Sequence, residues 1–537
     1  MAGPLKPLPI LDFSAGENTV TSPYLLKPNQ SQQCINLLLD EHGALRVRDG
    51  TLVQTVAAPR PDRPIVKLFD FVQVDGTVRR FALQYGTFGP NSLFLRDTSP
   101  WTLIGDFTQA YLTPDMLTFN GQAIIANGNQ EVLKRSDGTA ATGLVALVGA
   151  PNGAHIAQHL NYLWAWNTLN ASAALAGPSS LQSSDINNSA SWPAGNQTFI
   201  AKDDGTSGQA LAQYTIAEAG ISPTATLICW KDFAGYEATG VLGAATFSVQ
   251  KIKSDMGCVA PRSVQFVAGF GIIRLTHRGF ALYDGVNDTL ISEEERPRIF
   301  GRDSYTGLDW SNITRCMATQ VANPPLYICA CPVQDSNGRL QRVFIFDLVR
   351  RAWTVCQYAN DIGTMQLTLD PNVLPSVLIG DANRGYVRRA FAGDTTDDEV
   401  AINWNLVTRA VSMGTPMERA YWRRMLAKFF GMTAGSSVSA TFFYGPTAPV
   451  GQTTLAKTIP TVTPLNSYTG WGSDPWSSTP WGSQNAATIT DTDLEFAMGM
   501  KANNVTVSLS GSGPGKIRGL EFHARPQVPT RSTVVNA

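Results

Sequence analysis

The chain carries little charge for its length. Charged residues make up 15% of the 537 residues, and 41 Lys and Arg almost balance 42 Asp and Glu, which leaves a formal net charge of −1. Proteins that bind DNA tightly usually concentrate Lys and Arg in a basic patch, and neither half of this chain is strongly basic. The composition therefore argues against sequence-specific DNA binding, while 43% hydrophobic residues suffice for one or more cores.

Cysteine pairs and long apolar runs are also missing. The seven Cys form no Cys-x-x-Cys pair and are odd in number, which argues against a disulfide framework or a structural zinc site. No stretch approaches the roughly twenty apolar residues of a membrane span, and the amino terminus has no basic region followed by an apolar one. We therefore expect a protein made in a cytoplasm that does not insert stably into a membrane.

The most informative segment present is 257–292, GCVAPRSVQFVAGFGIIRLTHRGFALYDGVNDTLIS. It contains four short apolar runs separated by three turns that each contain Gly. The runs are too short for stable helices, and turns of this kind join antiparallel strands. The segment therefore predicts a four-stranded antiparallel meander, which is the unit of a β-propeller.

Looser copies of this unit flank the segment with a period of roughly 40 to 50 residues, which is typical of a propeller. Upstream copies begin near Ile65, and downstream copies include PPLYICACPV followed by RVFIFDL. About six units can be counted, with seven as the nearest alternative. The predicted fold class is thus all-β, a β-propeller of about six blades with an inserted β-rich domain and a C-terminal domain like a β-sandwich.

Spacing and composition change at two places along the chain. Between Asn170 and Lys253 the regular period stretches, and after Gly393 a different strand pattern begins. The stretch Met417–Phe430 fits either a helix or a strand. The predicted domains are an N-terminal arm with a propeller-closing strand (1–60), propeller blades (61–169), an inserted domain (170–255), further blades (256–393) and a C-terminal β domain with a Trp-rich loop (394–537).

A search for catalytic groups identifies no set that the spacing brings together. His155 and His159 are four residues apart, but the sequence HIAQH has no Glu of a zinc-protease signature and no third ligand is evident. Acidic clusters remain as candidate pairs for glycoside hydrolysis, although solvated loops are the usual place for such runs. They lie at Asp203-Asp204, at Glu293-Glu294-Glu295 and at Asp394, Asp397, Asp398 and Glu399. We predict no catalytic, cofactor-binding or metal-binding residues, and no enzyme activity.

Three tryptophans form another local signal. Trp471, Trp476 and Trp481 recur every five residues in YTGWGSDPWSSTPWGS, a spacing that fits neither helix nor strand. Exposed Trp rings are rigid contact anchors for protein partners, sugars or membrane interfaces, but the same rings would also serve to cover one end of the C-terminal domain. Both interpretations stay open, and the loop is a candidate partner-contact site.

Several short motifs resemble the tail nozzle family of short-tailed bacteriophages, which includes packaged-DNA stabilisation proteins and tail tubular protein B. The central match is GCVAPRSV, RGFALYDG and TLIS, followed by Arg298-Ile299-Phe300. Further motifs that resemble the family are QCINLLLDEHGALRVRDGT, LQSSDINNSASWP and KIRGLEFHARPQ. The likeness extends over most of residues 30 to 525 and lies in spacing and scattered motifs.

The resemblance implies a structural protein of the virion tail, without cofactors. It implies a homohexameric ring beneath the head-to-tail adaptor that continues the DNA channel from the portal. The ring would retain packaged DNA until ejection and dock tail fibres or a needle, with DNA as transiting cargo. The alternative from a different class is a phage-tail propeller that binds or depolymerises polysaccharide, with the three tryptophans stacking on sugars.

Overall fold

The computed structural model describes residues 4–54, 59–86, 89–96, 101–169, 177–216, 224–302, 305–334, 336–368, 376–414, 418–432, 436–444, 451–458 and 491–526. The chain divides into two compact units. The sandwich unit comprises Met1–Asp49, Arg350–Cys356 and Thr395–Ala537, and the propeller unit comprises Gly50–Val349 and Gln357–Asp394. Each unit has its own strand order and its own core.

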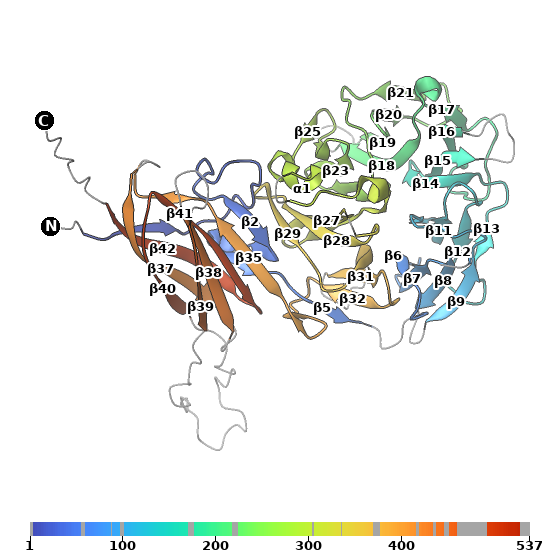
Figure 1. Ribbon diagram of the computed structural model, residues 1–537. Coiled ribbons are helices and arrows are strands. Elements are labelled where there is room, and N and C mark those ends of the chain that lie inside the picture. Colours follow the sequence, from blue (N-terminus) through green and yellow to red (C-terminus); the bar gives the residue numbers. More distant parts are fainter. Residues whose placement is uncertain are drawn as a thin grey trace, which may run out of the picture. The chain divides into compact units, whose positions relative to one another are not determined.

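The propeller unit is a succession of small antiparallel sheets, here called blades 1 to 7 (Figure 1). Blade 1 consists of β6 (Ile65–Val72), β7 (Val78–Gln84), β8 (Ser92–Arg96) and β9 (Thr102–Asp106). Blade 2 consists of β10 (Asp115–Phe119), β11 (Gln122–Ala126), β12 (Lys134–Ser136) and β13 (Val145–Ala146). Blade 3 consists of β14 (Asn152–His159), β15 (Tyr162–Leu169), β16 (Gly177–Ser183) and β17 (Gln197–Phe199). Blade 4 consists of β18 (Gly208–Ile216), β19 (Thr224–Lys231), β20 (Gly235–Thr239) and β21 (Ser248–Lys251). Blade 5 consists of β22 (Gln265–Val267), β23 (Gly271–Thr276), β24 (Gly279–Tyr283) and β25 (Asp288–Leu290). Blade 6 contributes β26 (Met317–Ala322), β27 (Pro325–Pro332) and β28 (Leu340–Asp347) to this unit, and blade 7 is β30 (Ile362–Leu367), β31 (Val377–Asp381), β32 (Val387–Ala390) and β5 (Thr51–Val53).

The blades close into a ring. The first strand of each blade contacts the first strand of the next, from β6 through β10, β14, β18, β22 and β26 to β30, and β30 contacts β6 again. The last blade is completed by β5 from the N-terminal part of the chain, which pairs antiparallel with β32 from Thr51 opposite Ala390 to Val53 opposite Arg388. The described residues therefore form a seven-bladed β-propeller whose ring is closed by a strand from its N-terminal end.

Two sequence-based expectations about the ring differ from this arrangement. The sequence count favoured about six blades, and residues 170–255 were expected to form an inserted domain. Instead, the described part of that range supplies β16 and β17 to blade 3 and all four strands of blade 4. The longer and more polar connections in this range stretched the repeat period, but connection length changes the free energy of strand pairing only weakly.

The segment 257–292 forms the predicted meander, with β22, β23, β24 and β25 paired in order. Its tight geometry requires glycine at Gly271, where φ is +130° and a Cβ would lie 2.1 Å from the Tyr283 carbonyl oxygen. Any side chain there would clash with backbone, so this turn residue is fixed by sterics. A short helix, α1 (Arg296–Phe300), follows the meander after the 3-10 turn η4 (Glu293–Glu295).

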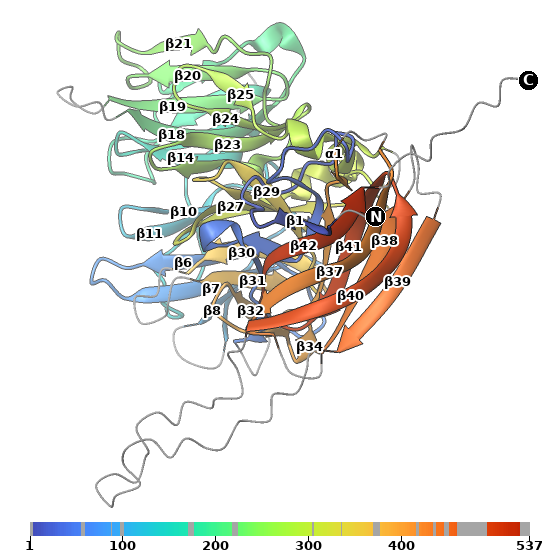
Figure 2. The ribbon, with the colours of Figure 1, turned by 90° about the vertical axis from the view of Figure 1, so that its left-hand side faces the viewer.

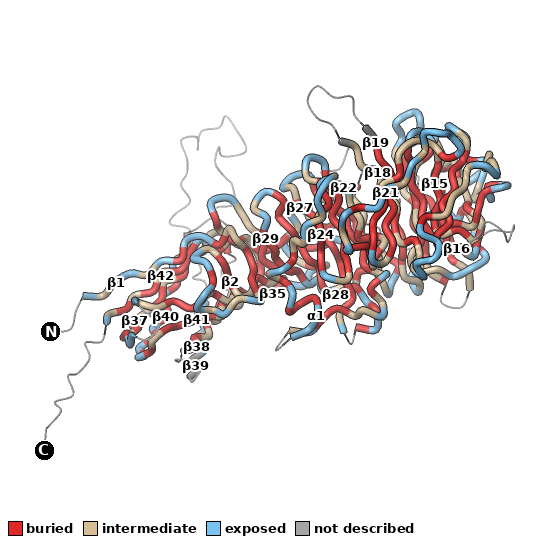
Figure 3. The backbone as a smooth tube through the Cα atoms, turned by 90° about the horizontal axis from the view of Figure 1, so that it is seen from above, coloured by how far each residue is buried: buried red, intermediate tan, exposed pale blue. Residues whose placement is uncertain are grey.

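Apolar clusters of the propeller lie between neighbouring blades rather than in one central core. One cluster joins blades 1 and 2, the next joins blades 2 and 3, and others join blades 3 and 4, blades 4 and 5, and blades 1 and 7. Figure 3 shows buried residues running through the strands of the blades. Blade-to-blade packing of apolar faces thus supplies the main stabilisation of the ring.

The sandwich unit contains two sheets that are mainly antiparallel. One sheet has the order β3 (Leu37–Leu39), β4 (Leu45–Val47), β42 (Lys516–Pro526), β37 (Ala420–Phe430) and β40 (Asp491–Ala502), with β1 (Lys6–Ile10) also on β42. The other has the order β2 (Ser31–Ile35), β35 (Asn403–Thr408), β41 (Asn504–Ser512), β38 (Ser437–Tyr444) and β39 (Gly451–Thr458). Further short strands of this unit are β29 (Ala352–Cys356), parallel to β2, then β36 (Val411–Ser412) on β41, and the hairpin β33 (Thr396–Asp397) and β34 (Val400–Ala401).

The N-terminal residues belong to the sandwich unit rather than to a separate arm. Strands β1 and β4 pair with β42, and β2 pairs with β35. Figure 2 shows β37, β40 and β42 lying side by side. The ambiguous stretch at Met417–Phe430 contains the strand β37, in which buried and less buried residues mostly alternate, because one of its faces packs into the apolar core of this unit.

Candidate functional site

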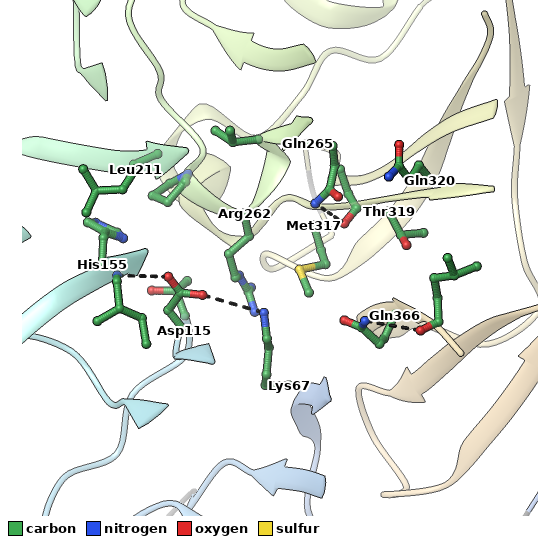
Figure 4. Close-up of a pocket in the computed structure, with 17 residues that line it drawn as sticks. Lys67, Asp115, His155, Leu211, Arg262, Gln265, Met317, Thr319, Gln320 and Gln366 are labelled. Atoms are coloured by element: carbon green, nitrogen blue, oxygen red, sulfur yellow. Dashed lines mark hydrogen bonds and ion pairs between the residues drawn. The ribbon is translucent and has the colours of Figure 1, made fainter. Parts of the chain in front are cut away.

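A cavity of about 310 Å³ lies among the first strands of the blades in the propeller unit (Figure 4). The first strand of every blade contributes to its lining, so the cavity follows the axis of the ring, and we call it the axial cavity. One lining residue from each of these strands, in blade order, is Lys67, Asp115, His155, Leu211, Gln265, Thr319 and Gln366. Interiors and mouths of closed β architectures are among the places where proteins bind small ligands.

Two ionisable side chains face each other in the axial cavity. The Lys67 ammonium lies 3.9 Å from the Asp115 carboxylate. Burial lowers the pKa of Lys67, an effect that Asp115 partly offsets and nearby Arg262 reinforces. The Asp115 carboxylate also accepts backbone N–H groups of Met116 at 2.9 Å and Ile156 at 3.3 Å.

Arg262 enters the same cavity from the 3-10 turn η3 (Pro261–Ser263). Its Nη1 donates to the Val66 carbonyl at 2.8 Å and its Nη2 to the Arg315 carbonyl at 3.0 Å, so it joins blade 1 to the segment that precedes blade 6. Figure 4 shows Arg262 and Lys67 pointing toward one another beside Asp115. Burial lowers the pKa of Arg262 to about 10, so the guanidinium is still protonated at neutral pH.

The two histidines that share a strand have separate surroundings. Both lie on β14; His155 lines the axial cavity and His159 packs against Trp164, with ring centroids 5.9 Å apart. Burial lowers the pKa of each to about 4, so both are neutral at neutral pH. Within the described ranges, no group of three or more His, Cys, Asp or Glu side chains is placed to hold a metal ion.

Members of each candidate acidic cluster are engaged in ion pairs of the framework. Asp204 accepts a hydrogen bond from Lys231 at 2.6 Å, and this lysine also donates to Ser179, so it links blades 4 and 3. Glu295 pairs with Arg298 at 3.6 Å. Arg389 pairs with Asp394 in the propeller unit, whereas Asp397 belongs to the sandwich unit. These contacts give Asp204, Glu295 and Asp394 structural roles as partners of cations.

Residues of the N-terminal motif contact one another in the sandwich unit. Arg48 donates through Nε to the Asn36 carboxamide oxygen at 3.0 Å and makes two further bonds to Asp397, at 2.9 and 2.5 Å. Asn36 in turn donates to the Asn403 carbonyl at 2.6 Å. The side chains of Asn36, Arg48 and Asp397 are buried, so this motif builds a polar network that ties the N-terminal strands to the C-terminal ones.

The three tryptophans predicted as a partner-contact loop, Trp471, Trp476 and Trp481, lie outside the described residues. That site stays a prediction. The axial cavity, by contrast, was not predicted from the sequence. The available signal was a charged residue near the beginning of two first strands, Lys67 in the apolar run IVKLFDFV and Asp115 in DMLTF.

No protein-family model matches the chain, and no curated protein matches it. The chain is similar to solved β structures. One is BBS1N, in a crystal structure in complex with ARL6DN, at 11% identity over 64% of this chain and 97% of that one, with a TM-score of 0.39. Another is Sqt1 of Saccharomyces cerevisiae, at 10% identity over 64% of this chain and 99% of that one, with a TM-score of 0.36. The propeller assignment rests on the strand pairing described above, and these likenesses add nothing about function.

Helices of membrane-spanning length and apolarity do not occur in the part of the chain that the structure describes.

Proposed function

We propose that this protein is a structural component of a bacteriophage tail, the tail nozzle beneath the portal and adaptor. In this proposal it continues the DNA channel, retains packaged DNA until ejection, and docks fibres or a needle. The observation that carries the proposal is that the residues responsible for the family resemblance have structural roles that depend on their identity. Asn36 and Arg48 hydrogen-bond to one another, and Arg262 bridges distant backbone carbonyls.

The architecture of the propeller unit favours a mechanical role. A ring of blades closed by β5 leaves no open end between first and last blade, and such closure protects a β protein against edge pairing and fraying. Buried cations such as Lys231 and Arg262 add links between blades. A subunit that must resist pressure from packaged DNA benefits from this kind of closure.

The charge of the chain suits a conduit. DNA binding is driven largely by the release of counterions when Lys and Arg approach phosphates. A chain with a net charge of −1 offers little of this attraction, so DNA would pass without being held along the wall. Retention would then be mechanical, through segments that narrow the channel and move aside at ejection.

The proposed assembly is a ring of six copies on the adaptor, with Trp471, Trp476 and Trp481 as contacts to a neighbouring tail protein. The number six comes from the family resemblance. Electron microscopy of the purified protein, alone and mixed with the adaptor ring, tests the assembly. We expect rings that cap the adaptor; a protein that stays monomeric in the presence of the adaptor would contradict the proposal.

Electron microscopy of particles assembled without this protein tests the function. We expect heads that fill and then lose DNA, on tails that end prematurely, and we expect the intact gene supplied in trans to restore both features. Tails of full length that retain DNA would overturn the proposal.

The alternative of a polysaccharide depolymerase is tested with purified protein and host surface polysaccharide. Under the nozzle proposal no reducing ends are released. Turnover that a single carboxylate substitution abolishes would replace the nozzle proposal with the enzymatic one.

A further inference from the structure

The axial cavity holds more positive than negative charge. Its lining contains Lys67 and Arg262 as cations and Asp115 as the carboxylate, while His155 is neutral at neutral pH. Two cations against one anion leave a net positive charge in a partly enclosed space. A buried charge without a counterion is costly, so this cavity favours the entry of an anion.

Hydrogen-bonding capacity of the cations is also left over. In the described part of the chain, the Lys67 ammonium is paired with the Asp115 carboxylate. The 3.9 Å between their N and O atoms is too long for a hydrogen bond. An ammonium group has three N–H donors, and the Lys67 side chain is 11% exposed, toward the cavity it lines. The Nε of Arg262 has no hydrogen-bond partner among the described residues, but this atom is itself buried, so Arg262 acts on the cavity through its charge.

Among the described residues, no hydrogen bond joins Asp115 to these donors, although its charge partly offsets theirs. Its carboxylate already accepts backbone N–H groups of Met116 and Ile156, so the acid is held on the wall of blade 2. The remaining lining supports a polar occupant, since Thr319, Gln265 and Gln366 also face the cavity. Gln265 and Gln366 are oriented by donating to the Ala318 and Leu367 carbonyls at 3.1 and 3.2 Å.

We propose that the axial cavity is a binding site for a small oxyanion of the phosphate or carboxylate class, held between the Lys67 ammonium and the Arg262 guanidinium. A volume of about 310 Å³ lies at the lower end of the range for small-molecule sites. It fits a small anion with some of its water and excludes a polymer. This site is independent of the nozzle proposal, because it depends only on the propeller unit.

Titration of the purified full-length protein with inorganic phosphate tests the site, with chloride used to keep the ionic strength constant and calorimetry to measure binding. We expect a saturable isotherm with one site per chain. Lys67→Met keeps most of the aliphatic stem but removes the charge, and should weaken phosphate binding about tenfold. Asp115→Asn removes the competing negative charge and should tighten binding about tenfold.

Lys134→Met is the matched control. Lys134 also pairs with an acid of the propeller, Glu131 at 2.7 Å, but it does not line the cavity, so this variant should bind phosphate as the parent does. Parallel titrations with acetate identify the chemical class of the oxyanion. Tighter binding of phosphate than of acetate indicates the phosphate class, and the reverse indicates the carboxylate class.

Three results would overturn the proposal: no saturable binding of either anion to the parent protein, equal shifts in Lys67→Met and Asp115→Asn in the same direction, or an equal loss in the Lys134→Met control. Circular dichroism verifies that each variant is folded. If Lys67→Met does not fold, the sign of the change in Asp115→Asn decides, since a purely structural role for Asp115 predicts no gain in affinity.

Discussion

The β-strands pack differently in the sandwich unit and in the propeller unit. The sandwich unit has one continuous apolar cluster, to which both of its sheets contribute, and several of its strands are long, such as β37 and β42. The propeller unit has several smaller clusters between its blades, and buried ion pairs occur within the blades. Among these pairs are Arg80 with Asp70, Arg274 with Asp288, and Arg388 with Asp381.

The strand register is fixed by different interactions in the two units. In a long strand with one buried face, a slip by one residue would expose the whole apolar face, so the pattern alone fixes the register. Blade strands such as β23 and β31 are short and buried on both faces, so alternation fixes their register less strongly, and the pairs add a second constraint. Asp70 lies directly opposite Arg80 on the neighbouring strand, and a slip would separate the two charges.

The largest effect is expected from breaking a buried pair of the propeller. Arg274 is fully buried, bonds Asp288 and the Gly257 and Met256 carbonyls, and lies 3.5 Å from the centroid of the Trp230 ring. Arg274→Met leaves the Asp288 carboxylate buried without its partner, which should cost about 3–5 kcal/mol of unfolding free energy. Hydrogen exchange of propeller amides, measured across a urea series, gives this loss of unfolding free energy. A loss below about 1 kcal/mol would show that the pair is dispensable.

The next largest effect is expected from a cavity in the apolar core of the sandwich unit. Leu509 on β41 is fully buried in that cluster. Leu509→Ala should cost about 3 kcal/mol through lost transfer free energy and the cavity left behind. Hydrogen exchange should show faster opening in β35, β38 and β41 and unchanged protection in blades 2 to 4. Equal loosening of those blades would contradict separate cores.

A smaller, pH-dependent effect concerns His159, whose ring nitrogens have no hydrogen-bond partner among the described residues. Burial lowers its pKa from 6.5 to about 4, so between these values the unfolded chain binds a proton that the folded protein does not. Stability therefore falls as the pH falls through this window, by about 2 kcal/mol per such group from pH 7 to pH 5. His159→Phe should reduce the loss, as measured by thermal unfolding at both values; an unchanged pH dependence would contradict the assignment.

The smallest effect is expected at an exposed pair of the sandwich unit. Arg424 pairs with Glu495 at 3.0 Å, with side chains 36% and 52% exposed. Water and salt screen such pairs, so Arg424→Met should change the unfolding free energy by less than about 1 kcal/mol. It is the control for Arg274→Met. A loss as large as in Arg274→Met would mean that burial does not decide the strength of these pairs.

Local patterns predicted individual strands better than their partners. Segment 257–292 was predicted as a meander because its Gly-bearing turns fix the connections. In contrast, the short strands β1 to β4 were assigned to an arm, since nothing in their own sequence reveals that their partners are β35 and β42. Residues 170–255 were set apart for the same reason, because long connections hid the blade period.

Alternation, turn residues and composition predicted a weakly charged protein that is rich in β-strands and built on a propeller, because all three are local properties of the sequence. Packing of the folded chain decided that the blades number seven and that strands β1 to β4 join the C-terminal strands in one sandwich, whereas a propeller-closing strand within residues 1–60 was already predicted from the sequence. It also decided the axial cavity, since Lys67, Asp115 and Arg262 stand far apart in the chain and meet only when the ring closes. Closure is a property of all blades together, and no single segment encodes it.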